Sequence, residues 1–277
     1  MDVAVIGGRG FVGSAVVDEL QGEHDVTTVD PRVGGEDHIS ADITDEQQML
    51  DVLDGFDAVV NLAGLSPMQE PRSISYKAVH VDGAENVAEA CEEYGARLVH
   101  MSALGADPDA DTAYLRTKGE GREAVLDADV DATVVEPSII YDRGNPLVEM
   151  AARLAPTRVF PHLTTRIQPV YRGDVADLFR LAVAGEIDEQ VLQVGGPGQM
   201  TLYEFVRRVY RANGYPCYAV PCQAAMSLVL QVMEVVPFVP YGADQARFLR
   251  FDNTVAENDA DRYVELTGMG EWLESAF

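Results

Sequence analysis

The feature that most restricts the fold of this chain lies in its first twenty residues. A short apolar run over residues 3–6 leads into the glycine-rich sequence GGRGFVG at residues 7–13, and apolar residues then recur at helical spacing up to Leu20. In a strand–loop–helix unit, missing side chains let the backbone approach a pyrophosphate, which the amide groups of the helix N-terminus bind. A tight turn without a ligand is the alternative. The residues expected to line a dinucleotide here are Gly7, Gly10, Phe11, Val12 and Gly13.

Short β-rich runs alternate with helical patterns along the chain. The expected strands cover residues 3–6, 25–29, 57–61, 96–101, 131–135 and 191–194, and the expected helices cover residues 11–20, 44–53, 79–94, 114–126 and 174–184. In the second helix, Thr44 is the expected N-cap and Gln47 stands at the capping-box position. The alternation predicts an α/β fold with a doubly wound, mostly parallel sheet of the Rossmann type.

The second half is less regular, because prolines divide it into short pieces and the chain becomes mainly helical after Thr201. We expect a dinucleotide-binding Rossmann domain over residues 1–197, with parts of a substrate lobe inserted around residues 140–166. Residues 198–277 are expected to form a small, mainly helical C-terminal substrate lobe. Within it, residues 226–238 have the apolar spacing of an amphipathic helix that closes the lobe, docking on a partner or membrane being the alternative.

The charge of the chain excludes several function classes. The 277 residues contain 46 Asp and Glu against 20 Lys and Arg, a net charge of −26. Such a surface repels phosphate backbones, so we expect no nucleic-acid partner and no charge-driven docking on anionic lipid. Of the 20 cationic residues only Lys77 and Lys118 are lysines. This composition is typical of halophilic adaptation to a high-salt cytoplasm, with an ordinary acidic protein as the alternative.

The cysteines and the start of the chain indicate where the protein works. Three cysteines in a chain of this length do not form a disulfide framework, and Cys217 and Cys222 lack neighbouring ligands for zinc, so no metal site is expected. The first apolar run is too short for a secretory signal. We therefore expect a cytoplasmic protein, with a peripheral position on the inner face of the membrane as the alternative.

An acid at the end of the second expected strand indicates which dinucleotide binds. Asp30 follows Gly13 by 17 residues, where a carboxylate holds the adenine ribose hydroxyls and repels a 2′-phosphate. This favours NAD, while Arg9 and Arg32 could instead attract the phosphate of NADP. Asp42, followed by Ile43, is placed to meet the adenine, with a plain surface acid as the alternative.

A tyrosine and a lysine lie four residues apart in the fourth expected helix, and so share one face. Tyr114 and Lys118 form this pair, and an ammonium beside a phenol is expected to lower the tyrosine pKa towards a range useful for acid–base catalysis. The alternative is a chance spacing. Ser102, just after the fourth strand, is either a hydroxyl partner in catalysis or a residue that only bonds the backbone.

Longer stretches resemble a known family. They include GGRGFVG, VVNLAG, HMSALGAD, AYLRTKGEGREAV, PSIIYD, QPVYRGDVADLF and DQARFLRFDNTV. Together they make the chain similar to extended, atypical short-chain dehydrogenases/reductases, labelled NAD-dependent epimerase/dehydratase. Within that group it resembles the NAD(P)H-binding accessory subunits of respiratory complex I and their prokaryotic relatives. The resemblance implies that Asn61, Ala63 and Gly64 contact the adenosine side of the cofactor. It implies that Tyr114, Lys118, Pro137 and Ser138 lie at its nicotinamide side.

The chain also departs from the family at positions that matter for activity. His80 replaces a helix asparagine of active epimerases, and Leu104 stands near the place of their catalytic Ser or Thr. Three functions therefore remain: an NAD(P)-dependent oxidoreductase or sugar-nucleotide epimerase-like enzyme acting on a small molecule, a non-catalytic accessory subunit of a respiratory NADH dehydrogenase, and a sensor of the NAD(H) ratio.

The acidic, lysine-poor composition predicts that the protein is most stable at molar salt, because counterions screen the repulsion among its carboxylates. Thermal melts from dilute buffer to multimolar KCl measure this dependence. A melting temperature that is highest in dilute buffer would contradict halophilic adaptation.

Overall fold

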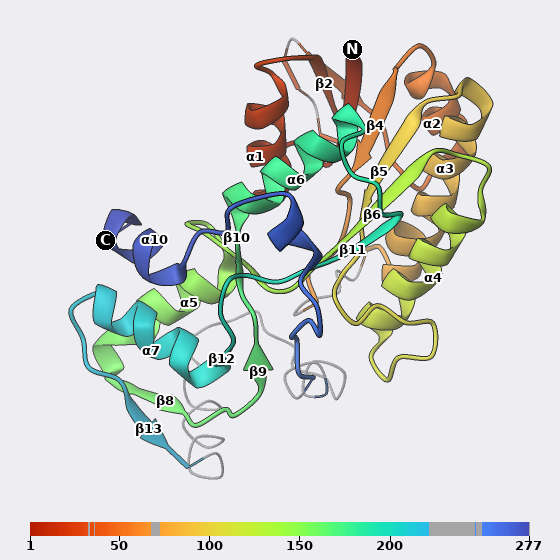
Figure 1. The fold of residues 1–277 in the computed structure, drawn as a ribbon. Helices are drawn as coiled ribbons and strands as arrows, with labels where there is room; N and C mark the ends of the chain where they lie inside the picture. Colours follow the sequence, from red (N-terminus) through yellow and green to blue (C-terminus); the bar gives the residue numbers. More distant parts are fainter. Residues whose placement is uncertain (33, 36, 68–72, 222–246, 248–250, 277) are drawn as a thin grey trace.

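The computed structural model describes residues 1–32, 34–35, 37–67, 73–221, 247 and 251–276. Its centre is a parallel sheet of seven strands in the order β11-β6-β5-β4-β1-β2-β3 (Figure 1). The strands are β1 (Asp2–Ile6), β2 (Asp25–Asp30), β3 (His38–Ser40), β4 (Ala58–Asn61), β5 (Arg97–Met101), β6 (Ala132–Pro137) and β11 (Val191–Val194). The order reverses between β1 and β4, which is the switch point at which doubly wound sheets bind ligands. The predicted Rossmann fold is confirmed.

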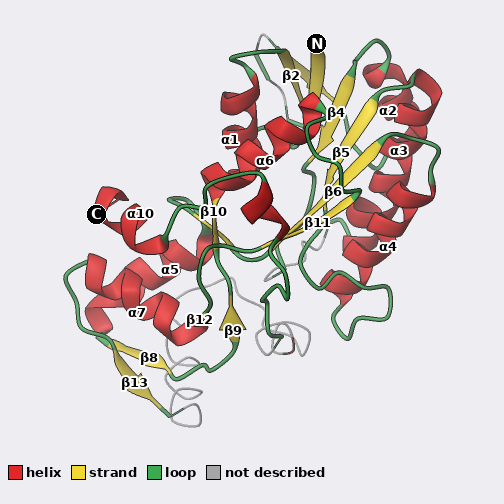
Figure 2. Ribbon diagram, in the orientation of Figure 1, coloured by secondary structure: helices red, strands yellow, loops and turns green. Residues whose placement is uncertain are grey.

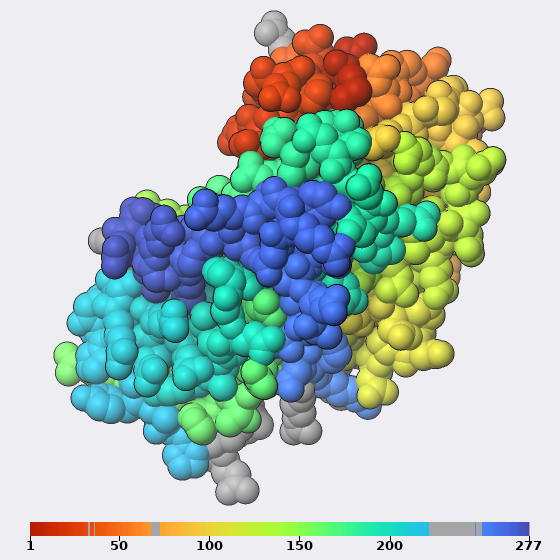
Figure 3. Space-filling model, viewed as in Figure 1, coloured from red at the N-terminus to blue at the C-terminus, as the bar shows by residue number. Residues whose placement is uncertain are grey.

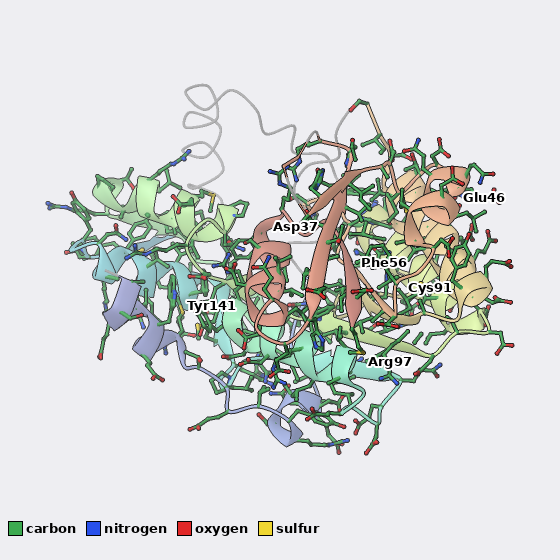
Figure 4. The ribbon with its side chains drawn as sticks, turned by 90° about the horizontal axis from the view of Figure 1, so that it is seen from above. Asp37, Glu46, Phe56, Cys91, Arg97 and Tyr141 are labelled. Atoms are coloured by element: carbon green, nitrogen blue, oxygen red, sulfur yellow. The ribbon has the colours of Figure 1, made fainter. Side chains whose placement is uncertain are left out.

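Helices cover both faces of this sheet (Figure 2). They are α1 (Phe11–Leu20) and α6 (Arg172–Ala184) on one face, and α2 (Glu46–Leu53), α3 (Gly83–Tyr94) and α4 (Ala113–Asp127) on the other. Alternate strand residues feed two separate cores, so Val5 packs with α1 and α6 while Ala4 packs with α2 and α3. In Figure 4 the labelled Cys91 lies with the second group of helices, where its side chain is buried.

A second, mainly helical lobe lies beside the carboxyl ends of the strands. Its helices are α5 (Pro146–Leu154), α7 (Leu202–Ala212) and α10 (Met269–Ala276), joined by the short strands β7 (Ile140–Tyr141), β8 (Val159–Pro161), β9 (Arg166–Ile167), β10 (Val170–Tyr171), β12 (Met200–Thr201) and β13 (Tyr218–Val220). A third core, centred on Tyr141, Phe205 and Trp272, holds these elements together. Figure 4 shows Tyr141 in this lobe, away from the sheet.

The last part of the chain returns from this lobe to the sheet. Figure 3 shows it in blue, lying across the junction between the two parts. Residues 251–266, which we name the C-terminal strap, include Ala260, Val264 and Leu266, and these pack into the core under α1 and α6. Trp272, a few residues later, belongs to the core of the second lobe. The expected boundary between residues 197 and 198 stays a prediction.

One expected helix start is wrong, and one expected helix lies outside the described residues. The N-cap of α2 is Asp45, whose carboxylate accepts from Gln48 N, because the Thr44 hydroxyl instead donates to Asp42 Oδ1 at 2.8 Å. Residues 226–238 and Cys222 lie outside the described residues. Within the part of the chain that the structure describes, no helix has the length and apolar content needed to cross a membrane.

Candidate functional site

The glycine loop is folded so tightly that side chains have no room. Gly7 has φ +75°, and its amide donates to Val29 O at 2.8 Å. A Cβ on Gly13 would lie 2.2 Å from Gly7 O, well inside van der Waals contact. The helix α1 starts after Gly10 without a side-chain cap. Its first amides therefore receive no hydrogen bond from a capping side chain, and pyrophosphate binding there stays a prediction.

Asp30 ends β2 beside this loop and is 4% exposed. Its Oδ1 accepts from Arg32 N at 2.9 Å and from Arg32 Nε at 3.1 Å. Its Oδ2 is buried and has no hydrogen-bond partner among the described residues. Burial raises the pKa of Asp30, but the hydrogen bonds and charge of Arg32 outweigh burial and hold that pKa below its usual value. The carboxylate is thus charged, and one oxygen is left to accept a hydroxyl.

Asp42 and Ile43 are held by protein contacts. Asp42 Oδ1 accepts from both the amide and the hydroxyl of Thr44, which shapes the turn into α2. Ile43 is buried, its carbonyl accepts from Asn86 Nδ2, and a Cβ on Gly83 would lie 3.1 Å from its side chain. Contact of these two residues with adenine stays a prediction.

The loop after β4 reaches from the glycine loop to helix α4. Asn61 is 1% exposed, and its Oδ1 accepts from Ala63 N at 3.1 Å, which fixes the start of the loop. A Cβ on Gly64 would lie 3.3 Å from Lys118 Nζ. The predicted adenosine-side residues and the predicted nicotinamide-side lysine therefore meet along one edge of the sheet.

Lys118 is buried at 3% exposure, and its Nζ donates to Met101 O at 2.9 Å. Burial lowers its pKa to about 8. The expected effect on Tyr114 is wrong in sign: burial, followed by the nearby Tyr76 phenol, raises the pKa of Tyr114 well above its usual value. Tyr114 and Lys118 share one helix as predicted, but loss of solvation, and not the charge of Lys118, decides the pKa of Tyr114. Tyr114 is therefore a neutral phenol that can donate a proton.

Two aromatic rings lie against the Tyr114 ring. The Tyr114 ring meets the Tyr76 ring edge-on at 5.8 Å and the His80 ring edge-on at 5.5 Å. His80 lies in a π-helical turn, η1 (Ala78–Asp82), just before α3. Its Nε2 accepts from Leu65 N at 3.0 Å and its Nδ1 is 3.0 Å from Thr117 Oγ1. Burial lowers the pKa of His80 to about 2, so a neutral imidazole joins the β4 loop to α4.

A second buried histidine lies on β5 and was not singled out by the sequence. His100 is 2% exposed, and neither ring nitrogen has a hydrogen-bond partner among the described residues. Burial, followed by the charge of Lys118, lowers its pKa to about 3. The wall behind Lys118 thus holds two neutral imidazoles, which are less costly beside an ammonium than charged ones.

The serines of the candidate site are both bonded inside the protein. The Ser102 hydroxyl donates to Lys118 O at 3.2 Å, which matches the structural alternative for this residue. Pro137 ends β6, and its carbonyl accepts from Leu104 N at 3.0 Å. Ser138, next in the chain, donates to Asn253 Oδ1 at 2.6 Å. Roles of these residues in catalysis or at a nicotinamide stay predictions.

Arg172 is a further residue at the glycine loop that sequence reasoning missed. Its Nη1 donates to Phe11 O at 3.0 Å, and its guanidinium lies 5.2 Å from the Phe11 ring. Its Nε pairs with Asp142 Oδ2 at 2.9 Å, and Asp142 Oδ1 accepts from Trp272 Nε1. Arg172 therefore ties the start of α1 to the second lobe. Its only sequence signal was its place in QPVYRGDVADLF.

Known proteins share this sequence pattern. Residues 3–125 match the NAD dependent epimerase/dehydratase family. NADH dehydrogenase (ubiquinone) 1 alpha subcomplex subunit 9, mitochondrial, from Arabidopsis thaliana is 28% identical over 92% of this chain and 71% of that protein. dTDP-4-dehydrorhamnose reductase from Mycolicibacterium smegmatis is 26% identical over 76% of this chain and 69% of that protein.

Solved structures share the fold along the whole chain. MoeE5 in complex with UDP-glucose and NAD has a TM-score of 0.76 and 21% identity, over 100% of this chain and 97% of that chain. dTDP-4-dehydrorhamnose reductase from Bacillus anthracis in complex with NADP has a TM-score of 0.74 and 18% identity, over 99% of this chain and 96% of that chain. These similarities show that this chain shares the fold of both structures.

The buried lysine predicts a specific dependence of stability on pH. Its pKa is about 8 in the folded chain and returns to its ordinary value of 10.5 on unfolding. Between these values the unfolded state binds more protons, so this lysine makes stability rise with pH, by up to about 1.4 kcal/mol per pH unit. We expect Lys118→Met to remove that rise in urea unfolding at pH 7.5, 8.5 and 9.5.

The other lysine of the chain is a matched control. Lys77 is exposed and paired with Asp82, and that hydrogen bond raises its pKa. Lys77→Met should therefore keep the rise in stability between pH 8 and 9.5. Identical pH slopes for the parent and for Lys118→Met would show that burial does not perturb this ammonium.

Proposed function

We propose, from the match of residues 3–125 to the NAD dependent epimerase/dehydratase family, that the chain binds NAD(H) as an NAD(P)-dependent oxidoreductase or epimerase-like enzyme. The observation that carries the proposal is Asp30 Oδ2, a buried and charged oxygen without a partner among the described residues. An unpaired buried polar atom costs about 1–3 kcal/mol. A ribose hydroxyl would remove that cost, beside a glycine loop where the N-terminus of α1 has no side-chain cap.

The same geometry favours NAD over NADP. Asp30 Oδ2 would face the 2′ position of the ribose, where a phosphate meets like charge in a buried setting. The guanidinium of Arg32 is engaged with Asp30 Oδ1 at 3.1 Å, so it is held by the acid rather than by a phosphate. Similar folds occur in complexes with either dinucleotide. The choice between NAD and NADP therefore depends on Asp30.

The residues around Tyr114 support a proton-donating role. A bound nicotinamide would accept or supply a hydride. Tyr114 stays protonated because burial raises its pKa, so its hydroxyl can donate a proton to a substrate oxygen. Lys118 keeps its ammonium between Met101 O and the Gly64 backbone, where it would meet ribose hydroxyls. The substrate class we propose is a small carbonyl or sugar nucleotide.

A non-catalytic accessory subunit of a respiratory NADH dehydrogenase is the second candidate. The hydroxyls of Ser102 and Ser138 both donate to backbone or side-chain groups of the protein, so each serine already has a structural role. The similar Arabidopsis thaliana protein carries the name of such a subunit. In this role the dinucleotide would stabilise the fold, and association with a respiratory complex or the membrane periphery would follow.

We expect the parent to bind NADH more tightly than NADPH. Asp30→Asn should weaken NADH binding about tenfold, because a hydrogen bond to a charged group contributes about 1.5–3 kcal/mol. It should also reduce the preference for NADH over NADPH, because the charge that repels a 2′-phosphate is lost. Calorimetric titration of both dinucleotides measures these effects.

Asp25→Asn, at the exposed start of the same strand, is the control and should change neither affinity. A parent that prefers NADPH, or that binds neither dinucleotide, would contradict the proposal.

Tyr114→Phe distinguishes the two candidate functions. The substitution keeps the ring and removes the hydroxyl, so NADH affinity should stay within a few-fold while turnover falls by roughly 10²-fold or more. Turnover is measured with a panel of sugar nucleotides, small carbonyls and quinones, with Tyr94→Phe on the outer face of α3 as the control. Unchanged turnover in Tyr114→Phe would remove the residue from catalysis. No turnover by the parent with any of the panel, despite tight NADH binding, would favour the accessory subunit.

A further inference from the structure

Asn253 in the C-terminal strap contacts both loops that flank the predicted nicotinamide side. Its Oδ1 accepts from the Ser138 hydroxyl at 2.6 Å and from Ile139 N at 3.0 Å, just after β6. Its Nδ2 donates to Leu104 O at 3.2 Å, in the loop after β5. The residue is 8% exposed, so these bonds are shielded from water. One amide thus bridges the two neighbouring loops.

The backbone of Asn253 is fixed as well. Its amide donates to Arg166 O at 2.8 Å, and its carbonyl accepts from Gln168 N at 2.9 Å and from the Ser138 hydroxyl. Two residues earlier, Phe251 lies against the β5 loop, where a Cβ on Gly105 would be 2.2 Å from its ring. The strap, in blue at the centre of Figure 1, therefore has little freedom to shift at this point.

An apolar side chain in place of Asn253 could hold the strap by packing alone, without hydrogen bonds to the two loops. A buried amide is costly unless each of its polar atoms is satisfied, and Asn253 meets that condition only while both loops keep their present separation. Leu104 N also donates directly to Pro137 O at 3.0 Å, and the bridge adds to this bond a fixed distance from Leu104 to Ile139, which hydrophobic packing alone would not specify. Both residues follow strands at the carboxyl edge, where ligands of such sheets bind.

Asn258 offers a comparison within the same strap. Its Oδ1 accepts from Gly195 N at 2.9 Å and its Nδ2 donates to Gly195 O at 3.0 Å. It therefore ties the strap to a single loop, after β11, at the edge strand of the sheet. The two asparagines have similar bonding, but only Asn253 joins the loops after β5 and β6.

We propose that Asn253 is a positioning residue of the dinucleotide site, which sets the separation of the β5 and β6 loops and thereby the place of the nicotinamide ring. This inference rests on the proposed function. Asp30 lies on β2, four strand spacings from β6, or about 19 Å. Asn253 therefore acts at the nicotinamide end only, and the adenosine end is held by other residues.

Two probes separate the ends of the site. ADP-ribose has the adenosine, pyrophosphate and second ribose but lacks the nicotinamide, whereas NADH carries all of them. Their affinities for the full chain are measured by calorimetry, and the emission of bound NADH reports the surroundings of the reduced ring. The variants are Asn253→Ala, which removes the bridge, and Asn253→Asp, which has the same shape but places a carboxylate oxygen at Leu104 O. Asn258→Ala is the matched control, and melting temperatures verify folding.

In both Asn253 variants we expect NADH affinity to fall about tenfold and the emission enhancement of bound NADH to fall with it. ADP-ribose affinity should stay within about threefold of the parent value. Asn258→Ala should leave both affinities and the emission unchanged, whatever its melting temperature. Equal losses for ADP-ribose and NADH, or the same losses in Asn258→Ala, would make Asn253 a general tie of the fold and overturn the inference. A parent that binds neither probe would instead overturn the proposed function, and this inference with it.

Discussion

The close approach of backbone to backbone around the first turn of α1 is the constraint on which the rest of the structure depends. Gly13 lies against Gly7 with no space for a Cβ, so a tight turn over residues 7–10 joins β1 to α1. α1 and α6 pack into the same core on one face of the sheet. Arg172 then joins α6 to Phe11 O, and Asp142 with Trp272 extends the connection into the second lobe.

Burial explains the charges of the candidate site better than pairing does. Lys118, His80 and His100 are all nearly inaccessible, and burial is the leading cause that lowers each of their pKa values. The same cause raises the pKa of Tyr114. Each shift favours the neutral form, as expected for titratable groups in a poorly solvated setting. Among the described residues, the groups that shift these pKa values after burial are the Lys118 ammonium, the His100 imidazole and the Tyr76 phenol.

The sequence predicted the features that depend on local pattern. The glycine loop, the alternation of strands and helices, and the shared helix of Tyr114 and Lys118 all follow from spacing, and the structure has them. The predicted N-cap of α2 was wrong by one residue because Asp42 accepts from the Thr44 hydroxyl. Burial raises the pKa of Tyr114 and Tyr76 adds to that rise, and the bridge to Ser138 depends on Asn253, which is 115 residues away in the chain. Neither neighbour can be read from periodicity, because both are brought there by tertiary packing.

The return of the strap to the sheet affects how the protein is made. Synthesis proceeds from the N-terminus, and domains tend to fold as they emerge from the ribosome. Here the core beneath α1 and α6 also takes in Ala260, Val264 and Leu266, which are translated well after the last strand of the sheet, β11. Until they arrive, an apolar part of that core stays open to solvent. The nascent protein must therefore wait for the C-terminal strap, and a ribosome that stalls after β11 would release a sheet with one face incompletely covered.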